Sequence, residues 1–201
     1  MSEVEFKPFE AFAIKTGSSF SEALVYVPGD VYDIKFANGM DLICGQVHRY
    51  RVRLPTMILM VTMNKICEYY RLFGIQCFAM MSTARVEGQF LKMMPFPWIN
   101  TSPGDAIACL GRRFQSECED SDLARLSRMS ALWYLGSTFT NDYGICTRGW
   151  PFEMEKGFQS HEFMAKWEEL SRDGLPDWDT NLRRRGQLEK IKVMAENPQA
   201  P

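Results

Sequence analysis

The sequence predicts an α+β protein in which antiparallel β-hairpins come first and helices follow. Residues 23–54 are rich in Val, Ile, Tyr and Phe and contain two turn-forming dipeptides, which is typical of strands joined by turns. Residues 53–74 form a long apolar segment that indicates a buried helix. From residue 96 onward, capping residues precede segments with apolar residues at helical spacing.

The first half is predicted to contain strands at 23–27, 31–36 and 41–53. Asn38-Gly39 is the strongest hairpin signal, because a two-residue type I′ turn needs positive φ at both central positions. A strict two-residue turn here would place unlike residues on the same face of the hairpin. Either the loop is longer or Gly45 marks a bulge, and the strand register around Asn38-Gly39 stays open.

The segment RLPTMILMVTMNKICEYYRLFG predicts a central buried helix over 56–73. Pro55 fits a first helical turn and Gly74 a C-terminal cap. Its apolar block at 57–61 is much shorter than the ~20 residues that a membrane-spanning helix needs. Four polar residues fall at helical spacing and would form a narrow polar stripe on this helix: Asn64, Lys65, Glu68 and Arg71.

Strands at 75–83 and 89–94 are expected to follow this helix. Further helices are predicted at 103–118, 121–139 and 160–173, and a last helix begins at Asp179 or Thr180. A variant of this arrangement is a ferredoxin-like βαββαβ core with an insertion, built from 41–53, 56–73, 75–83, 89–94, 103–118 and 143–148.

The predicted organisation is a single α+β domain over residues 1–195, followed by a disordered tail at 196–201. Its β-rich half is 1–95, with the helix 56–73 at the centre, and its helical half is 96–195. The 201 residues suffice for a sizeable core, and the hydrophobic fraction of 46% argues against wholesale disorder.

Charge and cysteine usage limit the function classes. With 23 basic against 25 acidic residues, the chain lacks the global positive charge of a non-specific nucleic-acid binder. The six cysteines contain no CxxC pair, and no phosphate-binding glycine motif occurs, so no cofactor or metal is expected. The acidic N-terminal segment lacks the apolar region of a secretory signal, which predicts a cytoplasmic protein with reduced thiols and no membrane association.

Arginine clusters are the main candidates for a binding surface. Arg49, Arg51 and Arg53 alternate, so on a strand their guanidinium groups project from one face, where they would bind phosphates or carboxylates. A second cluster, Arg183, Arg184 and Arg185, makes the last helix basic. A solvated surface explains each cluster at least as simply.

Large aromatic side chains in loops are the second candidate feature. Trp98, Trp150 and Trp178 lie in segments that contain proline or glycine, where a large ring either covers the core or meets a partner.

Together these features predict a non-enzymatic cytoplasmic binding protein, an inhibitor or an accessory subunit, that contacts a protein or ribonucleoprotein through the arginine clusters and loop aromatics. Two alternatives remain. One is a direct RNA or DNA binder that uses local basic patches. The other is a small intracellular enzyme with a polar site between sheet and helices, drawing on His48, Cys44, Glu87 or Asp142.

Overall fold

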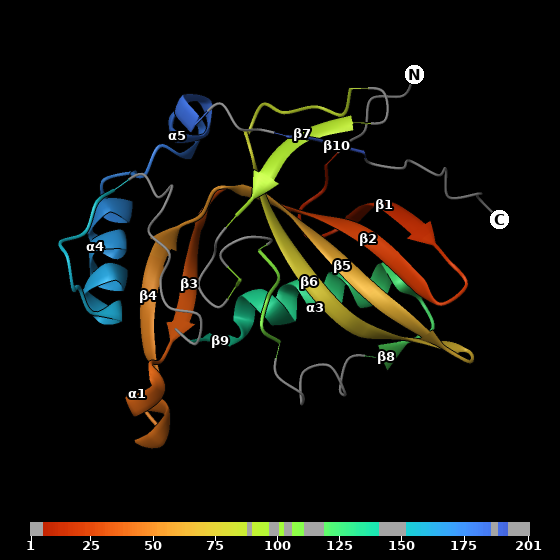
Figure 1. Ribbon diagram of the computed structural model, residues 1–201, viewed down its shortest axis with the longest axis horizontal. Helices are drawn as coiled ribbons and strands as arrows, with labels where there is room; N and C mark the ends of the chain where they lie inside the picture. The colour runs from red at the N-terminus through yellow and green to blue at the C-terminus, as the bar shows by residue number, and fades with distance from the viewer. Residues whose placement is uncertain are drawn as a thin grey trace.

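The computed structural model describes residues 6–87, 90–96, 101–102, 106–110, 119–140, 152–185 and 189–192. Over these residues the chain combines a curled antiparallel sheet with a smaller sheet and helices (Figure 1). The predicted class, α+β, is confirmed, whereas the arrangement within that class differs from the prediction.

The larger sheet has seven strands, and all of its paired strands are antiparallel. Their spatial order is β1-β2-β5-β6-β7-β10, and β8 pairs with the outer part of β6. The longest strands, β5 and β6, form a hairpin at its centre whose turn is residues 67–68. The strands are β1 (Ala11–Thr16), β2 (Phe20–Val27), β5 (Thr56–Ile66), β6 (Tyr69–Met80), β7 (Phe90–Pro95), β8 (Glu119–Asp120) and β10 (Glu189–Lys192).

The smaller sheet has the order β4-β3-β9, in which β3 pairs antiparallel with β4 and parallel with β9. Its strands are β3 (Val31–Phe36), β4 (His48–Arg53) and β9 (Thr138–Phe139). Helix α3 packs on the larger sheet, and α4 lies along the outer edge of β4 (Figure 1). The helices are α1 (Gly39–Ile43), α3 (Leu123–Gly136), α4 (Ser160–Arg172) and α5 (Trp178–Arg185).

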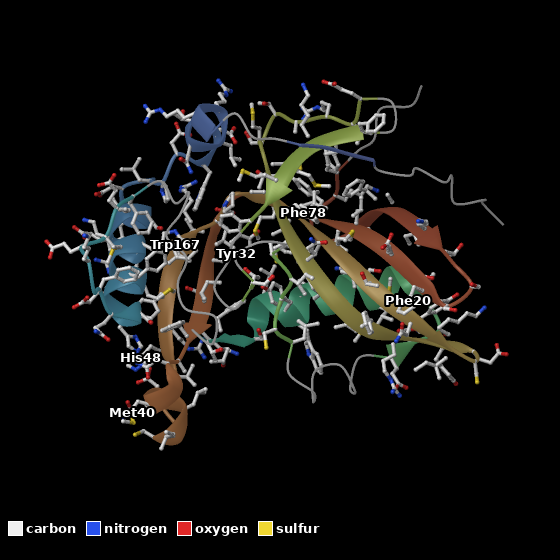
Figure 2. All side chains as sticks on the ribbon, viewed as in Figure 1. Phe20, Tyr32, Met40, His48, Phe78 and Trp167 are labelled. Carbon is white, nitrogen blue, oxygen red and sulfur yellow. The ribbon has the colours of Figure 1, made fainter. Side chains whose placement is uncertain are left out.

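The central strands are buried on both faces. On one face, Leu59 and its neighbours at alternate positions join a core that extends to Trp167 of α4. On the other face, Ile58 and Phe78 pack against Leu91 of β7 in a second cluster. Figure 2 shows Trp167 and Phe78 in these two separate regions. Strand β5 therefore needs apolar side chains at nearly every position of its first half.

The predicted central helix over 56–73 is wrong, because this segment forms β5 and the first part of β6. A strand buried on both faces loses the alternation of apolar and polar residues, so its sequence resembles that of a buried helix. The supposed polar stripe, from Asn64 to Arg71, surrounds the exposed hairpin turn instead. Gly74 lies inside β6 next to a bulge, and the ferredoxin-like variant fails with the helix.

The two-residue turn at Asn38-Gly39 and the single strand over 41–53 are also wrong, whereas the alternative of a longer loop is confirmed, because β3 and β4 pair antiparallel across a connection that contains α1. Asn38 is the N-cap of α1, and its side chain accepts a hydrogen bond from the Asp41 N–H at 2.9 Å. A capping residue and a turn residue look alike in sequence, because asparagine serves both positions. Only the second part of that segment, His48–Arg53, is a strand.

The other elements agree more closely with the prediction. Strand β3 has the predicted bounds, β2 contains 23–27, β6 contains most of 75–83, and β7 matches 89–94 within one residue at each end. Helices α3, α4 and α5 correspond to the last three predicted helices.

The predicted helix at 103–118 is wrong where it can be compared, because residues 106–110 are not helical and two of them form isolated β-bridges. The last predicted helix is too long, because it was expected to continue to about residue 195, whereas α5 ends at Arg185 and residues 189–192 form β10. The predicted strand at 143–148 and the tail at 196–201 lie outside the described residues. Within the described part of the chain, no helix is long and apolar enough to cross a membrane.

Candidate functional site

The β3–α1–β4 arm, residues 31–53, projects beyond the larger sheet, with α1 at its end (Figure 1). Helix α1 is fixed by a capping box, in which Asn38 and Asp41 each accept a hydrogen bond from the backbone N–H of the other, at 2.8 and 2.9 Å. The helix ends at Cys44, and Gly45 follows with φ +69°. This local chemistry gives the exposed end of the arm a defined shape.

The end of the arm is apolar although it faces solvent. None of the residues of α1 is buried. We call the exposed apolar side chains at the end of the arm the apolar tip. It consists of Met40, Leu42 and Ile43 of α1 and of Val47, which are exposed by 69, 48, 82 and 49%. Isolated apolar side chains are common on protein surfaces, but four within eight residues of a projecting loop mark a candidate contact surface.

The outward face of the arm is basic. Along β4, Tyr50 and Val52 turn toward the core, so the alternating arginines take the opposite side, as predicted. Lys35 of β3 pairs with Arg49, and Asp33 pairs with Arg51. We call Lys35, Arg49, Arg51 and Arg53 the basic face. Arg49 and Arg51 are exposed, and neither guanidinium forms an ion pair with any other described residue.

Arg53 differs from its two neighbours because it lies where α4 and α5 meet β4. Its carbonyl accepts hydrogen bonds from the indole N–H groups of Trp167 and Trp178, at 3.1 and 2.9 Å, and its N–H donates to Ser171 Oγ at 2.8 Å. Its buried Nε has no hydrogen-bond partner among the described residues. Glu168 accepts the Arg51 N–H at 2.8 Å in the same way. Helix α4 thus covers the free edge of β4 and the Arg53 end of the basic face, and leaves Arg49 and Arg51 exposed.

The remaining predicted binding residues differ in how exposed they are. Trp178 is only 6% exposed and is the first residue of α5, so the prediction that it is a loop aromatic on a partner surface is wrong. Arg183 and Arg184 are exposed on α5. The backbone of Arg185 belongs to the same helix, while its side chain, Trp98 and Trp150 lie outside the described residues.

A histidine–aspartate cluster lies between the arm and α4, and the sequence analysis missed it. The chain has two histidines, His48 and His161, and both approach the carboxylate of Asp41. His161 Nε2 lies 2.6 Å from Asp41 Oδ2, and its Nδ1 lies 2.7 Å from Tyr50 Oη. His48 Nε2 lies 3.7 Å from Asp41 Oδ1, and the imidazole centroids are 4.6 Å apart. Figure 2 shows His48 near the end of the arm that carries Met40.

The carboxylate at the centre of this cluster is held in its charged form. The Asn38 backbone N–H, with a further contribution from His161, lowers the pKa of Asp41 below its ordinary value. The three potential ligand atoms from Asp41, His48 and His161 all lie within 4.8 Å of one another. No sequence motif predicts that these three residues meet, because the two histidines are 113 positions apart. The sequence shows only that the chain has no other histidine.

The groups expected for an enzyme site do not assemble in the described residues. No hydrogen bond there joins the side chains of His48, Cys44 and Glu87 to one another, and Asp142 lies outside those residues. His161, in the first turn of α4, is half-buried against Phe36 and hydrogen-bonded to Asp41.

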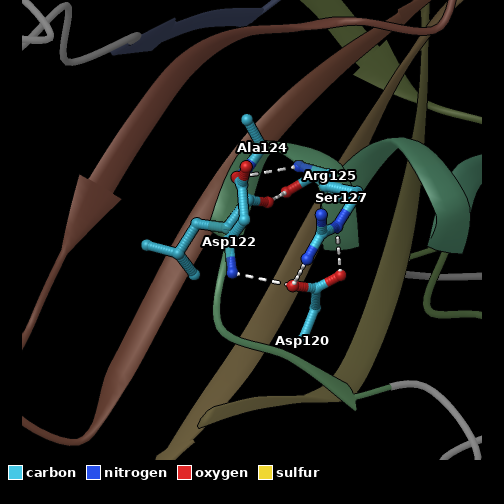
Figure 3. Close-up of polar contacts among 6 residues, drawn as sticks. Asp120, Asp122, Ala124, Arg125 and Ser127 are labelled. Carbon is cyan, nitrogen blue, oxygen red and sulfur yellow. Dashed lines mark hydrogen bonds and ion pairs between the residues drawn. The ribbon is translucent and has the colours of Figure 1, made fainter. Parts of the chain in front are cut away.

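A second polar cluster lies at the start of α3, and its members cap the helix and form an ion pair with one another (Figure 3). Asp122 caps the helix by accepting the N–H groups of Ala124 and Arg125, at 2.9 and 3.1 Å. Asp120 binds the Arg125 guanidinium through two bonds of 2.5 and 2.6 Å, which lower the pKa of Asp120 to about 2. Since the two charges satisfy each other, this cluster offers little to a ligand.

Comparison of the chain with protein-family models, curated proteins and solved structures finds no match. The function therefore has to be argued from the geometry of the arm and of the cluster beside it.

Proposed function

We propose that this protein is a non-enzymatic binding protein of the cytoplasm, an inhibitor or an accessory subunit, and that its β3–α1–β4 arm docks onto a protein partner. The observation that carries the proposal is the combination, on one projecting arm, of the apolar tip with the exposed Arg49 and Arg51, which form no ion pair within the described part of the chain. The surface it fits has acidic side chains beside an apolar pocket.

The division of roles follows from the energetics of interfaces. Burying the tip residues, above all Ile43 and Met40, removes apolar area from water and supplies affinity. The arginines guide encounter and fix orientation, because charges at the rim of an interface act mainly on the association rate and on specificity. An acidic partner would also relieve the repulsion between Lys35 and Arg49, which are direct cross-strand neighbours.

Lys35 of the basic face is engaged within the protein, because its Nζ donates to the carbonyl of Gly136 at 3.1 Å, at the C-terminal end of α3, so Arg49 and Arg51 are the cations offered to the partner. One further feature supports the proposal. Cys44 and Cys67 are exposed free thiols, which suits a reducing compartment such as the cytoplasm.

Direct binding to RNA or DNA, or to a ribonucleoprotein, is the second candidate. It is favoured by the exposed Arg183 and Arg184, which add positive charge on α5. Nucleic-acid binding would weaken steeply with added salt, because phosphate contacts release counterions. Docking through the apolar tip would weaken much less.

In the test, the purified full-length protein is first used as bait in a lysate of the native host to identify the partner. The affinity of that partner is then measured for the wild type and for each variant. Arg49→Ala/Arg51→Ala and Ile43→Ser should each weaken partner binding by about tenfold or more. The matched control is Lys166→Ala/Arg172→Ala, which removes two charges of α4 that are engaged in local ion pairs with Glu169 and Glu168. Equal affinity for wild type and both arm variants would contradict the proposal.

A further inference from the structure

The histidine–aspartate cluster brings together three side chains from three separate elements. Asp41 comes from α1, His48 begins β4, and His161 lies in the first turn of α4. Asp41 and His48 are close in the sequence, but His161 lies 120 residues from Asp41, so the convergence of both histidines on one carboxylate is a property of the fold. Two imidazoles and one carboxylate, with ligand atoms within 4.8 Å of one another, form the donor set of open three-ligand sites for zinc and similar ions.

Two of the three groups are already oriented by neighbours, as ligands in metal sites usually are. The Asn38 N–H holds Asp41 Oδ2 at 2.8 Å, and the Tyr50 hydroxyl holds His161 Nδ1 at 2.7 Å. These contacts place His161 Nε2 against the carboxylate, 2.6 Å from Asp41 Oδ2. His48 is more exposed, with 45% of its side chain accessible against 29% for His161 and 13% for Asp41, which leaves one side open to solvent.

We propose that Asp41, His48 and His161 form a binding site for a divalent transition-metal ion of the Zn²⁺ class, with solvent completing its coordination. The proposal is independent of the docking function.

Only small movements are required for this site to close around an ion. In a tetrahedral site with bonds of about 2.0–2.1 Å, neighbouring ligand atoms lie roughly 3.3 Å apart. The distance from His48 Nε2 to Asp41 Oδ1, 3.7 Å, is already close to this value, while the 2.6 Å between His161 Nε2 and Asp41 Oδ2 must widen. His161 would bind the ion through Nε2, and its Nδ1 would keep the contact with Tyr50 Oη.

A bound ion would connect the arm to α4 through its ligands. At present His161 makes this connection near the tip through its hydrogen bonds to Asp41 and Tyr50, while further along β4 the backbone of Arg51 and Arg53 is hydrogen-bonded to Glu168, Ser171 and Trp167 of α4. The ion would stabilise the folded state in proportion to its concentration, because it binds the native arrangement of three elements. Its affinity should fall at acidic pH, because imidazole must be deprotonated to act as a ligand.

The experiment is a titration of the full-length protein, freed of metal by dialysis against a chelator, with Zn²⁺ alone and in competition with a colorimetric chelator. We expect one ion per chain with micromolar or tighter affinity and a rise in melting temperature. His48→Gln removes an exposed ligand without disturbing the core and should weaken binding at least about tenfold. Tyr50→Phe keeps the ring but removes the hydroxyl, and should weaken binding by roughly tenfold.

The control is Cys44→Ser, since this exposed thiol three residues from Asp41 is the simplest alternative zinc ligand. This variant should bind Zn²⁺ as the wild type does. In addition, the imidazole NMR signals of both histidines should shift together on addition of Zn²⁺. The proposal is overturned if no stoichiometric binding occurs, if His48→Gln binds as tightly as wild type, or if Cys44→Ser abolishes binding.

Discussion

Two hairpins of this protein, the β5–β6 hairpin and the β3–α1–β4 arm, use their side chains in opposite ways. Much of the first is buried on both faces, and its polar residues are concentrated at the turn. The second buries one face through Ile34, Phe36 and Val52, while its other face and its end remain exposed. Both hairpins expose apolar side chains near their ends, Ile66, Tyr69 and Phe73 in the first and the apolar tip in the second, but only the arm places them beside the alternating arginines of β4.

This difference separates residues needed for folding from residues available for contact. In β5, apolar character follows from burial and needs no functional explanation. In the arm, the basic face and the apolar tip have no comparable structural role, since α1 has no buried residue. The arm is therefore where substitutions should alter binding without altering stability.

The largest contrast between the two hairpins is expected in thiol chemistry. Cys77 of β6 is fully buried against Tyr134, and burial raises the pKa of the Cys77 thiol to about 12. Cys44 at the end of α1 is exposed. Because the thiolate is the reactive form, iodoacetamide should modify Cys77 roughly a thousandfold more slowly than Cys44 at mildly alkaline pH.

The measurement is mass spectrometry of the labelled peptides over time. After unfolding in guanidinium chloride, the two cysteines should react at similar rates, which serves as the control. Fast labelling of Cys77 in the native protein would show that β6 is not buried as described.

The second contrast compares one substitution, Leu→Ala, in both hairpins. Leu59 of β5 is fully buried, so Leu59→Ala should lower the free energy of unfolding by about 2–5 kcal/mol through lost burial and the cavity left behind. Leu42 on the apolar tip is 48% exposed, and Leu42→Ala should change it by less than about 0.5 kcal/mol. Urea denaturation monitored by circular dichroism measures both. Equal losses would mean that the tip packs as part of the core.

The same comparison explains how far the fold could be predicted from the sequence. Strand β3 and helix α4 were predicted well because each buries a single face, which leaves a clear alternation or helical periodicity. The segment 56–73 was mistaken for a helix because β5 is covered on both sides by residues distant in sequence. Only tertiary structure shows that a second layer, including Leu91, covers the far face of this strand.

The candidate site was predictable only in part, for the same reason. The alternation of Arg49 and Arg51 on β4 is a local property and was visible in the sequence. The meeting of His48 with His161 depends on α4 packing along the edge of β4, which no local pattern records. Trp178 was misplaced on the surface because its role, to donate a hydrogen bond to Arg53, also arises only from packing.

A smaller effect is expected where α4 covers the edge of the arm. Ser171→Ala removes the acceptor for the partly buried Arg53 N–H and should cost about 1–3 kcal/mol, because the donor is left unpaired. Amide hydrogen exchange at Arg53 should become faster at the same time. Ser18→Ala, in an exposed turn, is the control and should leave both quantities unchanged. An unchanged exchange rate in the Ser171 variant would indicate that another group protects this amide.

The smallest effect concerns Asp41 and appears only as a dependence on pH. Because the Asn38 N–H, followed by His161, lowers the folded-state pKa of Asp41 below its ordinary value of 3.8, the charged carboxylate stabilises the folded state. This contribution is fully present above the ordinary value and disappears as the pH falls through the lower, folded-state pKa. Asp41→Asn should therefore melt at a lower temperature than wild type near neutral pH, and the gap should close in acid.

Melting curves of both proteins across the acidic range measure this gap. Asp33→Asn, on the outward face of the same arm, controls for the loss of one negative charge and should produce a smaller gap. A gap that is constant through the acidic range would mean that Asp41 supports α1 through hydrogen bonding alone, because an asparagine oxygen can still accept the Asn38 N–H. In that case the shape of the arm would depend on the hydrogen bonds of residue 41 and not on the negative charge of Asp41.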